Sequence, residues 1–263
     1  MNQNPYAPPH DDLPPRPQAT GEGGFIEGGR GVEAGRGYAW VTEGWEIFKL
    51  NAGMWILVCL VWGLITIVLN VIPVVGRFAF ALIAPMFSAG VILGCRHLRE
   101  GRTFGIGALF EGFQHAGPLL IIGLVHVGWS LVLAGVEKAL GIGAAIKPSG
   151  DPMAVLRQLQ PLYAFLGISI FAGIPITMAT YYAPALVALQ GLSPVDAMKS
   201  SFLGAVKNIL PFIVYTIVTM FCAILAVIPC GLGLFVLAPV MAASVYAGYR
   251  DVFFEDQPPP RDY

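Results

Sequence analysis

Charged residues are scarce in this sequence. Asp, Glu, Lys and Arg make up 12% of its 263 residues, whereas 56% of the residues are hydrophobic. Because an average soluble domain has about 25% charged residues, this deficit argues against a soluble domain and predicts an integral membrane protein. The formal net charge is −1, and a chain without a basic excess is not expected to bind nucleic acid. Membrane lipids are the partners that the composition predicts.

Catalytic and cofactor-binding motifs are also missing. The sequence has no nucleophile elbow, Walker loop, HExxH, GxGxxG or paired-carboxylate pattern, so we expect neither an enzymatic activity nor a cofactor. Its four cysteines form no CxxC pair. Cys95 and His97 together offer two ligands, which is fewer than the four of a structural zinc site, so no metal is expected.

Long apolar runs dominate what is present. A membrane-spanning helix needs about 20 mostly apolar residues, and six runs qualify: 54–72, 78–95, 118–136, 162–189, 209–228 and 232–249. Helices satisfy their own backbone hydrogen bonds in lipid, whereas open sheets do not. The sequence therefore predicts an all-α integral membrane protein with six transmembrane helices. Between the third and fourth runs, a short helix that begins at Asp151-Pro152 is expected to lie on the membrane surface.

An internal repeat organises these runs. Three of them contain an Ala-Pro pair, at Ala84-Pro85, Ala183-Pro184 and Ala238-Pro239. After the first and third pairs, small residues and an arginine recur at equal offsets: Gly90, Gly94 and Arg96 in one run, Ser244, Gly248 and Arg250 in the other. An amphipathic stretch precedes each pair of runs, at 38–51, 106–115 and 195–208. We interpret the chain as three parallel repeats of an interfacial helix plus a helical hairpin.

The repeat divides the chain into segments. The predicted units are 37–100, 101–192 and 193–255, which together form one transmembrane domain. Residues 1–36 are rich in Pro and Gly and are predicted to be a disordered cytoplasmic tail, and residues 256–263 form a C-terminal tail.

Lysine and arginine counts predict the orientation. Seven such residues fall on one side of the spans, at positions 49, 96, 99, 102, 199, 207 and 250, and four on the other, at 77, 138, 147 and 157. Because cytoplasmic loops carry the excess of positive charge, both termini are expected in the cytoplasm.

Polar residues inside the spans are the candidates for function. His126 lies near the middle of the third run, and Thr177, Thr180 and Tyr181 form the most polar patch of the fourth. These four residues either line a cavity or satisfy one another and the backbone of a helix broken by Pro175 and Pro184. No Asp or Glu lies at mid-span, which argues against a proton-coupled pump built on carboxylates.

Two further groups of residues have predicted roles. Arg96, Arg99 and Arg102 are candidate contacts for anionic lipid headgroups. Gly90, Gly94 and Gly248 are expected where helices pack closely. Pro85, Pro184 and Pro239 are expected to kink three equivalent helices at one membrane depth, because Pro85 and Pro239 each precede an arginine by roughly 16 Å of helix.

A resemblance rests on three of these features: Trp45 and Phe48 ahead of a span, the Ile-Pro turns at Pro73 and Pro229, and the Ala-Pro spans that end in Arg96 or Arg250. Over about residues 37–255 they resemble a group of uncharacterised bacterial six-span inner-membrane proteins. That group is distantly similar to YciC-type proteins and to the membrane domain of some glycerophosphodiester phosphodiesterases. The resemblance implies a bacterial inner membrane and no established activity, and the sequence has no phosphodiesterase catalytic domain.

Two functional hypotheses follow. The first is a non-enzymatic integral membrane protein that acts as an envelope scaffold or lipid-associated accessory. The alternative is a transporter or channel for a small, weakly polar or amphiphilic solute, which predicts a cavity lined by His126, Thr180 and Tyr181.

Overall fold

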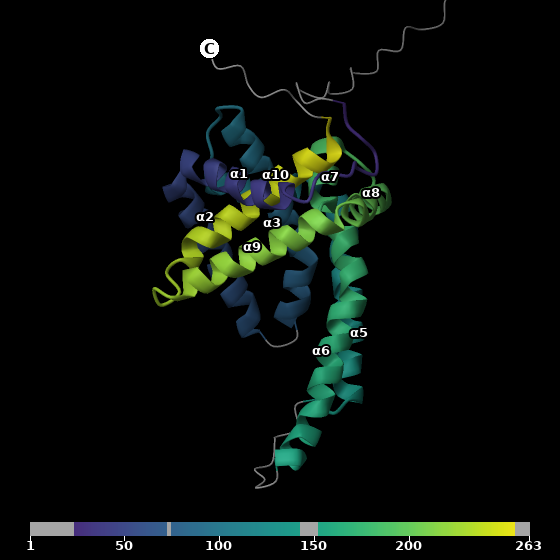
Figure 1. The fold of residues 1–263 in the computed structure, drawn as a ribbon. Coiled ribbons are helices and arrows are strands. Elements are labelled where there is room, and N and C mark those ends of the chain that lie inside the picture. The colour runs from purple at the N-terminus through teal and green to yellow at the C-terminus, as the bar shows by residue number, and fades with distance from the viewer. Residues whose placement is uncertain (1–23, 73–74, 143–151, 256–263) are drawn as a thin grey trace, which may run out of the picture.

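The computed structural model describes residues 24–72, 75–142 and 152–255. The named elements in these segments are all helical, which confirms the predicted all-α class (Figure 1). In chain order they are α1 (Arg36–Leu50), α2 (Ala52–Val71), α3 (Val75–Arg99), α4 (Ile106–Glu111), the 3-10 helix η1 (Gly112–His115), α5 (Ala116–Ala139), α6 (Pro152–Thr180), α7 (Ala183–Gln190), α8 (Pro194–Lys207), α9 (Ile209–Val227) and α10 (Leu234–Phe253).

Five segments of the described chain are long and apolar enough to cross a bilayer: Ala52–Val71, Val75–Arg99, Ile106–Ala139, Leu156–Gln190 and Ile209–Val227. Their outer surfaces carry large exposed apolar side chains, such as Leu64 at 62% and Phe171 at 78% exposure. We predicted six spans, and α10 is not among these five. It ends in Arg250 and Asp251 and packs against α1, α2, α3 and α9, so much of its surface contacts protein rather than lipid.

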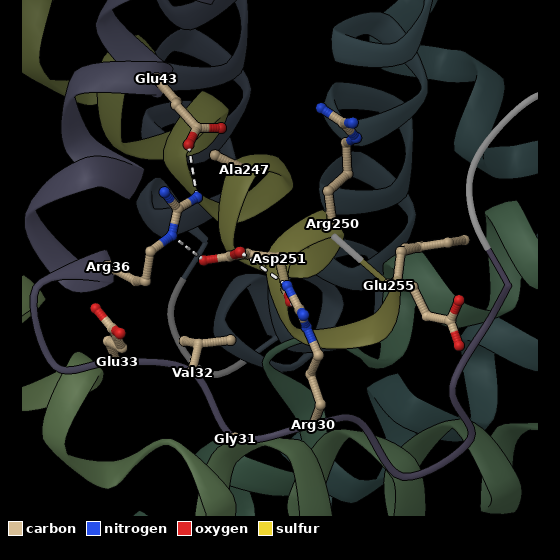
Figure 2. A pocket seen from close by; sticks show the side chains of 11 residues that line it. Arg30, Gly31, Val32, Glu33, Arg36, Glu43, Ala247, Arg250, Asp251 and Glu255 are labelled. Carbon is tan, nitrogen blue, oxygen red and sulfur yellow. Dashed lines mark hydrogen bonds and ion pairs between the residues drawn. The ribbon is translucent and has the colours of Figure 1, made fainter. Parts of the chain in front are cut away.

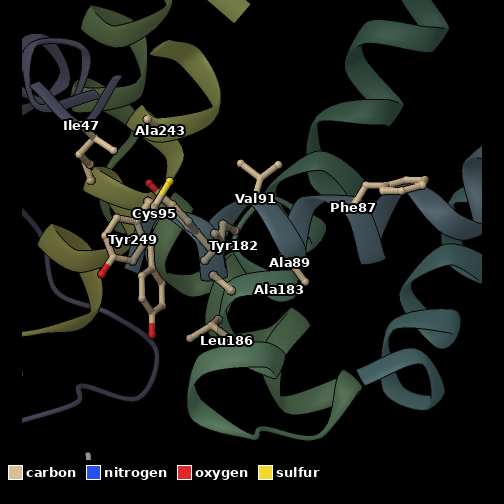
Figure 3. Packing of buried hydrophobic residues seen from close by; sticks show 14 of the residues in the cluster. Ile47, Phe87, Ala89, Val91, Cys95, Tyr182, Ala183, Leu186, Ala243 and Tyr249 are labelled. Carbon is tan, nitrogen blue, oxygen red and sulfur yellow. The ribbon is translucent and has the colours of Figure 1, made fainter. Parts of the chain in front are cut away.

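The buried core lies where α1, α3, α7 and α10 meet. Cys95, Tyr182, Leu186 and Tyr249 are fully buried there, from three different helices and the junction between α6 and α7 (Figure 3). In Figure 1 the pairs α2–α3, α5–α6 and α9–α10 extend away from this region, and the α5–α6 pair reaches farthest. The core therefore sits at one end of the molecule, and the long helices project from it.

The fourth predicted span is interrupted. We expected one helix over 162–189 with a kink at Pro184, but α6 ends at Thr180 and α7 begins at Ala183. Pro184 lies in the first turn of α7, where its missing N–H breaks no helical bond. Ser201 of α8 bridges the gap, because its hydroxyl donates to the Met178 carbonyl at 2.7 Å and accepts from the Tyr182 N–H at 3.0 Å.

The predicted surface helix after Asp151 is also corrected. Residues from Pro152 onward belong to α6, which runs for 29 residues through Pro161 and Pro175. At 1.5 Å per residue this helix is about 43 Å long, which exceeds a hydrocarbon core of about 30 Å. Its first turns therefore extend the membrane helix instead of forming a separate one.

The predicted disordered tail is wrong for its last part. Residues 24–35, which we name the strap, lie across the ends of α8 and α10. The Ile26 N–H donates to the Phe253 carbonyl at 2.9 Å, and the Arg30 N–H donates to the Val252 carbonyl at 2.8 Å. Gly29 has φ 65°, and a Cβ there would lie 2.8 Å from the Val252 side chain, so the glycines that suggested disorder permit a close contact. Residues 1–23 and 256–263 lie outside the described residues.

Short helices join neighbouring hairpins into a ring. Helix α1 packs mainly on α10, α4 and η1 pack on α3, and α8 packs on α6 and α7. Two of these contacts are alike in detail. A Cβ at Gly44 would lie 2.6 Å from the Val240 carbonyl oxygen, and a Cβ at Gly112 would lie 1.9 Å from that of Met86. In both places the backbones touch because no side chain separates them.

The Gly44 contact predicts a stability effect. Gly44→Ala forces α1 away from α10 and is expected to lower the free energy of unfolding by about 1–3 kcal/mol. Gly53→Ala is the matched control, because nothing lies within 4 Å of a Cβ at that position. Thermal unfolding in detergent measures both variants, and an equal loss in both would contradict this account of the α1–α10 contact.

Candidate intramembrane cavity

A cavity of about 480 Å³ lies between the long helices. All four residues predicted from the sequence line it: His126 from α5, Thr177 and Thr180 from α6, and Tyr181 at the α6–α7 junction. The remaining lining residues are Trp62, Ala84, Pro85, Ser88, Val91, Ile92, Pro184, Tyr215, Met241, Ala242 and Val245. The structure thus brings the predicted polar residues into one site.

His126 and Thr180 are hydrogen-bonded across the α5–α6 interface. The His126 Nε2 and Thr180 Oγ1 atoms are 3.0 Å apart, and the Thr180 hydroxyl also donates to the Ile176 carbonyl at 2.9 Å. Because a hydroxyl has one proton, Thr180 accepts from Nε2–H, which leaves Nδ1 of a neutral imidazole as an acceptor. Both readings of the sequence therefore hold for His126, which has a neighbouring-helix partner and lines the cavity.

Tyr215 and Ser244 form a second polar pair beside the cavity. The Tyr215 hydroxyl and Ser244 Oγ are 2.8 Å apart, and the Ser244 hydroxyl donates to the Met241 carbonyl at 2.7 Å. Either hydroxyl of this pair can be the donor, since the Tyr215 hydroxyl has a second acceptor in Met241 Sδ at 3.6 Å. Tyr181 packs edge-on against Tyr182, with ring centroids 4.8 Å apart, and this contact holds its ring at the cavity wall.

The polar groups of the cavity are neutral. Hydroxyls, one imidazole and the Trp62 indole supply its polar side chains, and no Asp, Glu, Lys or Arg is among the described lining residues. Groups of three or more His, Cys, Asp or Glu that could hold a metal ion are absent from the described part of the chain. Such a lining can orient a hydroxyl or carbonyl group of a bound molecule by hydrogen bonding, within an otherwise apolar wall.

Three polar or aromatic lining residues escaped the sequence reasoning. Trp62, Ser88 and Tyr215 come from α2, α3 and α9. One signal was available: Trp62 and His126 each lie eleven residues after the N-cap of their helix, Asn51 or His115. This shared position relates the first predicted unit to the second. An aromatic residue in an apolar run, however, does not itself indicate whether its side chain faces a cavity or lipid.

The predicted kink prolines differ in their positions. Pro85 lies inside α3 and Pro184 in the first turn of α7, and both line the cavity. Pro239 lies inside α10 and is buried, but the cavity wall from that helix is Met241, Ala242 and Val245.

The predicted packing glycines lie at close contacts. A Cβ at Gly90 would lie 2.4 Å from the Leu109 carbonyl oxygen. A Cβ at Gly94 would lie 2.5 Å from the Phe104 ring, and a Cβ at Gly248 would lie 2.6 Å from the Tyr182 hydroxyl. These distances leave no room for a side chain, so each glycine sits where another element passes directly over the helix.

The predicted headgroup arginines lie at and beyond the end of α3. Arg96 and Arg102 both form ion pairs with Glu100. The distance between Arg96 Nε and Glu100 Oε1 is 3.7 Å. Arg99 belongs to the same end of α3, and its charge acts on Glu43 of α1. Glu100 offsets part of the positive charge that the sequence suggested.

A charged pocket of about 400 Å³ was not predicted. It lies between the strap, α1 and the end of α10, and Figure 2 shows the Arg30 and Arg36 side chains pointing toward Asp251. Asp251 Oδ2 accepts from Arg36 Nε at 2.6 Å and from Trp40 Nε1 at 2.8 Å, while Arg30 Nε donates to the Asp251 carbonyl at 2.9 Å. The Asp251 side chain is 9% exposed, so this carboxylate is held almost entirely by protein groups.

Burial raises the pKa of Glu43, the fourth charged group of this cluster, although Arg36 at 2.9 Å opposes the shift. A carboxyl whose pKa is raised on folding favours the folded state below its unfolded pKa, and this contribution is lost as pH rises through the folded pKa. The pKa of Arg36 is raised as well: burial lowers it, but the hydrogen bond and charge of Asp251 outweigh burial.

These features define a class, the multi-pass α-helical membrane protein. Over 228 residues, covering 82% of each chain, the sequence is 25% identical to a probable inner membrane protein of Burkholderia thailandensis. No protein-family model matches the chain, and no solved structure matches it. The apolar helices and this similarity together assign the protein to the inner membrane as a multi-pass protein.

Asp251 gives the prediction of this subsection. Asp251→Asn leaves Arg30 and Arg36 without their carboxylate, and because both arginines are partly exposed the expected loss of stability is about 1–3 kcal/mol. The strap should also become more sensitive to protease. Glu46→Gln, at an exposed pair with Lys49, is the control, and an unchanged cleavage rate of the strap in Asp251→Asn would refute its role as anchor.

Proposed function

We propose that this is a non-enzymatic inner-membrane protein that binds a small, weakly polar or amphiphilic molecule in its central cavity. The observation that carries the proposal is the cavity of about 480 Å³ lined by His126, Thr177, Thr180 and Tyr181. This favours the transporter or channel hypothesis over a scaffold without a ligand, because a scaffold does not need a cavity with hydroxyls inside its spans.

The chemistry of the lining supports an uncharged ligand. A charged group is costly inside a membrane unless an opposite charge accompanies it, and the described lining residues offer none. A hydroxyl or carbonyl group suits the available partners, since His126 Nδ1 accepts and the Tyr181 hydroxyl both donates and accepts. The remaining apolar wall suits the hydrocarbon part of the ligand.

The proposed framework for this cavity is three parallel units with six spans, α10 being the sixth. Its support is the ring of contacts in which each short helix packs on the second hairpin helix of another unit: α1 on α10, α4–η1 on α3, and α8 on α6–α7. Each first hairpin helix then gives one large side chain to the cavity: Trp62 from α2, His126 from α5 and Tyr215 from α9. The cavity would lie on the axis that relates the units.

The proposed orientation places both termini in the cytoplasm, as the positive charges predict. The strap and the end of α10 meet at Asp251, and Arg99 lies close enough to influence Glu43, so these charged groups share one end of the molecule. That end would face anionic headgroups through Arg96, Arg99 and Arg102. We also propose that the protein is distantly related to YciC-type proteins and to the membrane domain of some glycerophosphodiester phosphodiesterases.

Paired hydroxyl and imidazole variants test the binding function. A photoactivatable long-chain alcohol, with its reactive group next to the hydroxyl, is expected to label the α6 segment around Thr177 to Tyr181 in protein held in lipid nanodiscs. His126→Leu with Thr180→Val should reduce this labelling about tenfold, since the hydrogen bond to His126, worth about 1.4 kcal/mol, is lost. Peptide mapping by mass spectrometry measures the label.

Thr66→Val is the matched control, because the Thr66 hydroxyl bonds only its own helix and does not line the cavity. Labelling that stays undiminished in the double variant, or wild-type protein that is not labelled in this segment, would contradict the proposed binding function.

The orientation has a separate test. Single cysteines at Arg157 and Lys199, in a chain whose four native cysteines are replaced by Ala, report on the two sides of the membrane. A membrane-impermeant maleimide should label position 157 in spheroplasts, while labelling at 199 should require permeabilisation. The opposite pattern would invert the proposed topology.

A further inference from the structure

A second hollow adjoins the cavity on the outer surface of the spans. It is a groove of about 670 Å³ between the α5–α6 pair and α9, which we name the α6–α9 groove. Its walls are mainly apolar, and the five isoleucines on them, Ile170, Ile174, Ile209, Ile213 and Ile217, are between 48% and 59% exposed. In Figure 1, α6 and α9 leave neighbouring positions near α8 and diverge, which is why the groove stays open.

The groove and the central cavity share two residues. Thr177 and Tyr181 line both hollows. Thr180, one turn from Thr177 on α6, is buried and bonded to His126 on the cavity side. A molecule that lay in the groove could therefore reach the polar groups of the cavity at this junction without crossing a further layer of protein.

The surroundings of the groove decide which part of a ligand it takes. Both α6 and α9 belong to candidate membrane spans, so the open side of the groove faces hydrocarbon. No charged residue is among its described lining residues. A hydrocarbon chain fits these conditions, whereas an extended peptide segment would bring unpaired backbone groups into lipid.

We propose that the α6–α9 groove is a lateral entrance from the bilayer for a single-chain, uncharged amphiphile. The chain of the ligand lies in the groove, and its hydroxyl head passes between Thr177 and Tyr181 to donate a hydrogen bond to His126 Nδ1. This inference rests on the proposed binding function and adds the ligand class and the route. Because the head enters sideways, the ligand need never leave the membrane.

The position of a label, rather than affinity, is the informative measurement. Lipid tails are as apolar as the groove wall, so lengthening the chain gains little free energy on transfer from bilayer to groove. Two long-chain alcohols distinguish the two parts of the site. They differ only in the position of a photoreactive diazirine, which lies beside the hydroxyl in one probe and near the chain end in the other. The first should label α6 near Thr177 to Tyr181, and the second should label the groove faces of α6 and α9 near Ile170 and Ile217.

Two glycines of α6 supply a matched pair of variants. A Cβ at Gly173 would lie 3.6 Å from the Trp129 ring, which is an ordinary contact, so Gly173→Leu narrows the groove without displacing backbone. Nothing lies within 4 Å of a Cβ at Gly167, which does not line the groove, so Gly167→Leu is the control. Gly173→Leu is expected to lower labelling by both probes about tenfold, because its side chain occupies the groove, with Gly167→Leu unchanged.

The outcomes separate this inference from the proposed function. If the head probe labels the cavity while the tail probe labels surfaces away from the groove, the cavity binds its ligand but the lateral entrance is wrong. If Gly173→Leu and Gly167→Leu reduce labelling equally, the groove is likewise not the route. If neither probe labels the cavity in the wild-type protein, the binding function itself fails. Melting temperatures of both variants, matched to wild type, show that any loss reflects binding and not unfolding.

Discussion

The Asp251 carboxylate connects parts of the chain that are more than 200 residues apart. Arg36 and Trp40 bond its side chain and Arg30 bonds its backbone, so the strap, α1 and the end of α10 meet at one group. Closure of the ring depends on this junction, because α1 and α10 come from opposite ends of the sequence while the other short helices pack on hairpins near them in the chain. Besides these ion pairs, the close packing at Gly44 and the buried Trp40 side chain hold α1 against α10.

The ring explains how a cavity can persist among helices that gain little from packing in lipid. Association of helices inside a bilayer lacks a hydrophobic driving force, whereas the aromatic core around Trp40, Tyr182 and Tyr249 is buried at the charged end of the molecule. Stability is concentrated there, and the long helices can diverge beyond it. A hollow between diverging helices removes few favourable contacts, so a binding site is compatible with this fold.

Sequence periodicity and hydropathy predicted much of the fold, and the reasons for the failures are physical. The runs at 54–72, 118–136 and 209–228 lie within a few residues of α2, α5 and α9. The break at Tyr181 was missed because both halves are apolar and a bond from Ser201 of another helix sustains it. The strap was missed because glycine-rich composition is shared by disordered chains and by chains that pack tightly.

The candidate site was predicted in part. His126, Thr177, Thr180 and Tyr181 stood out as polar residues within apolar runs, and all of them line the cavity. Trp62 and Tyr215 differ less in polarity from their neighbours. Whether their side chains face the cavity depends on how each helix is rotated about its axis. The Ser201 bridge has one more consequence. Since its two bonds satisfy backbone groups at the break between α6 and α7, α8 is tied to the C-terminal end of α6, so that a tilt of the 29-residue α6 moves α8 with it.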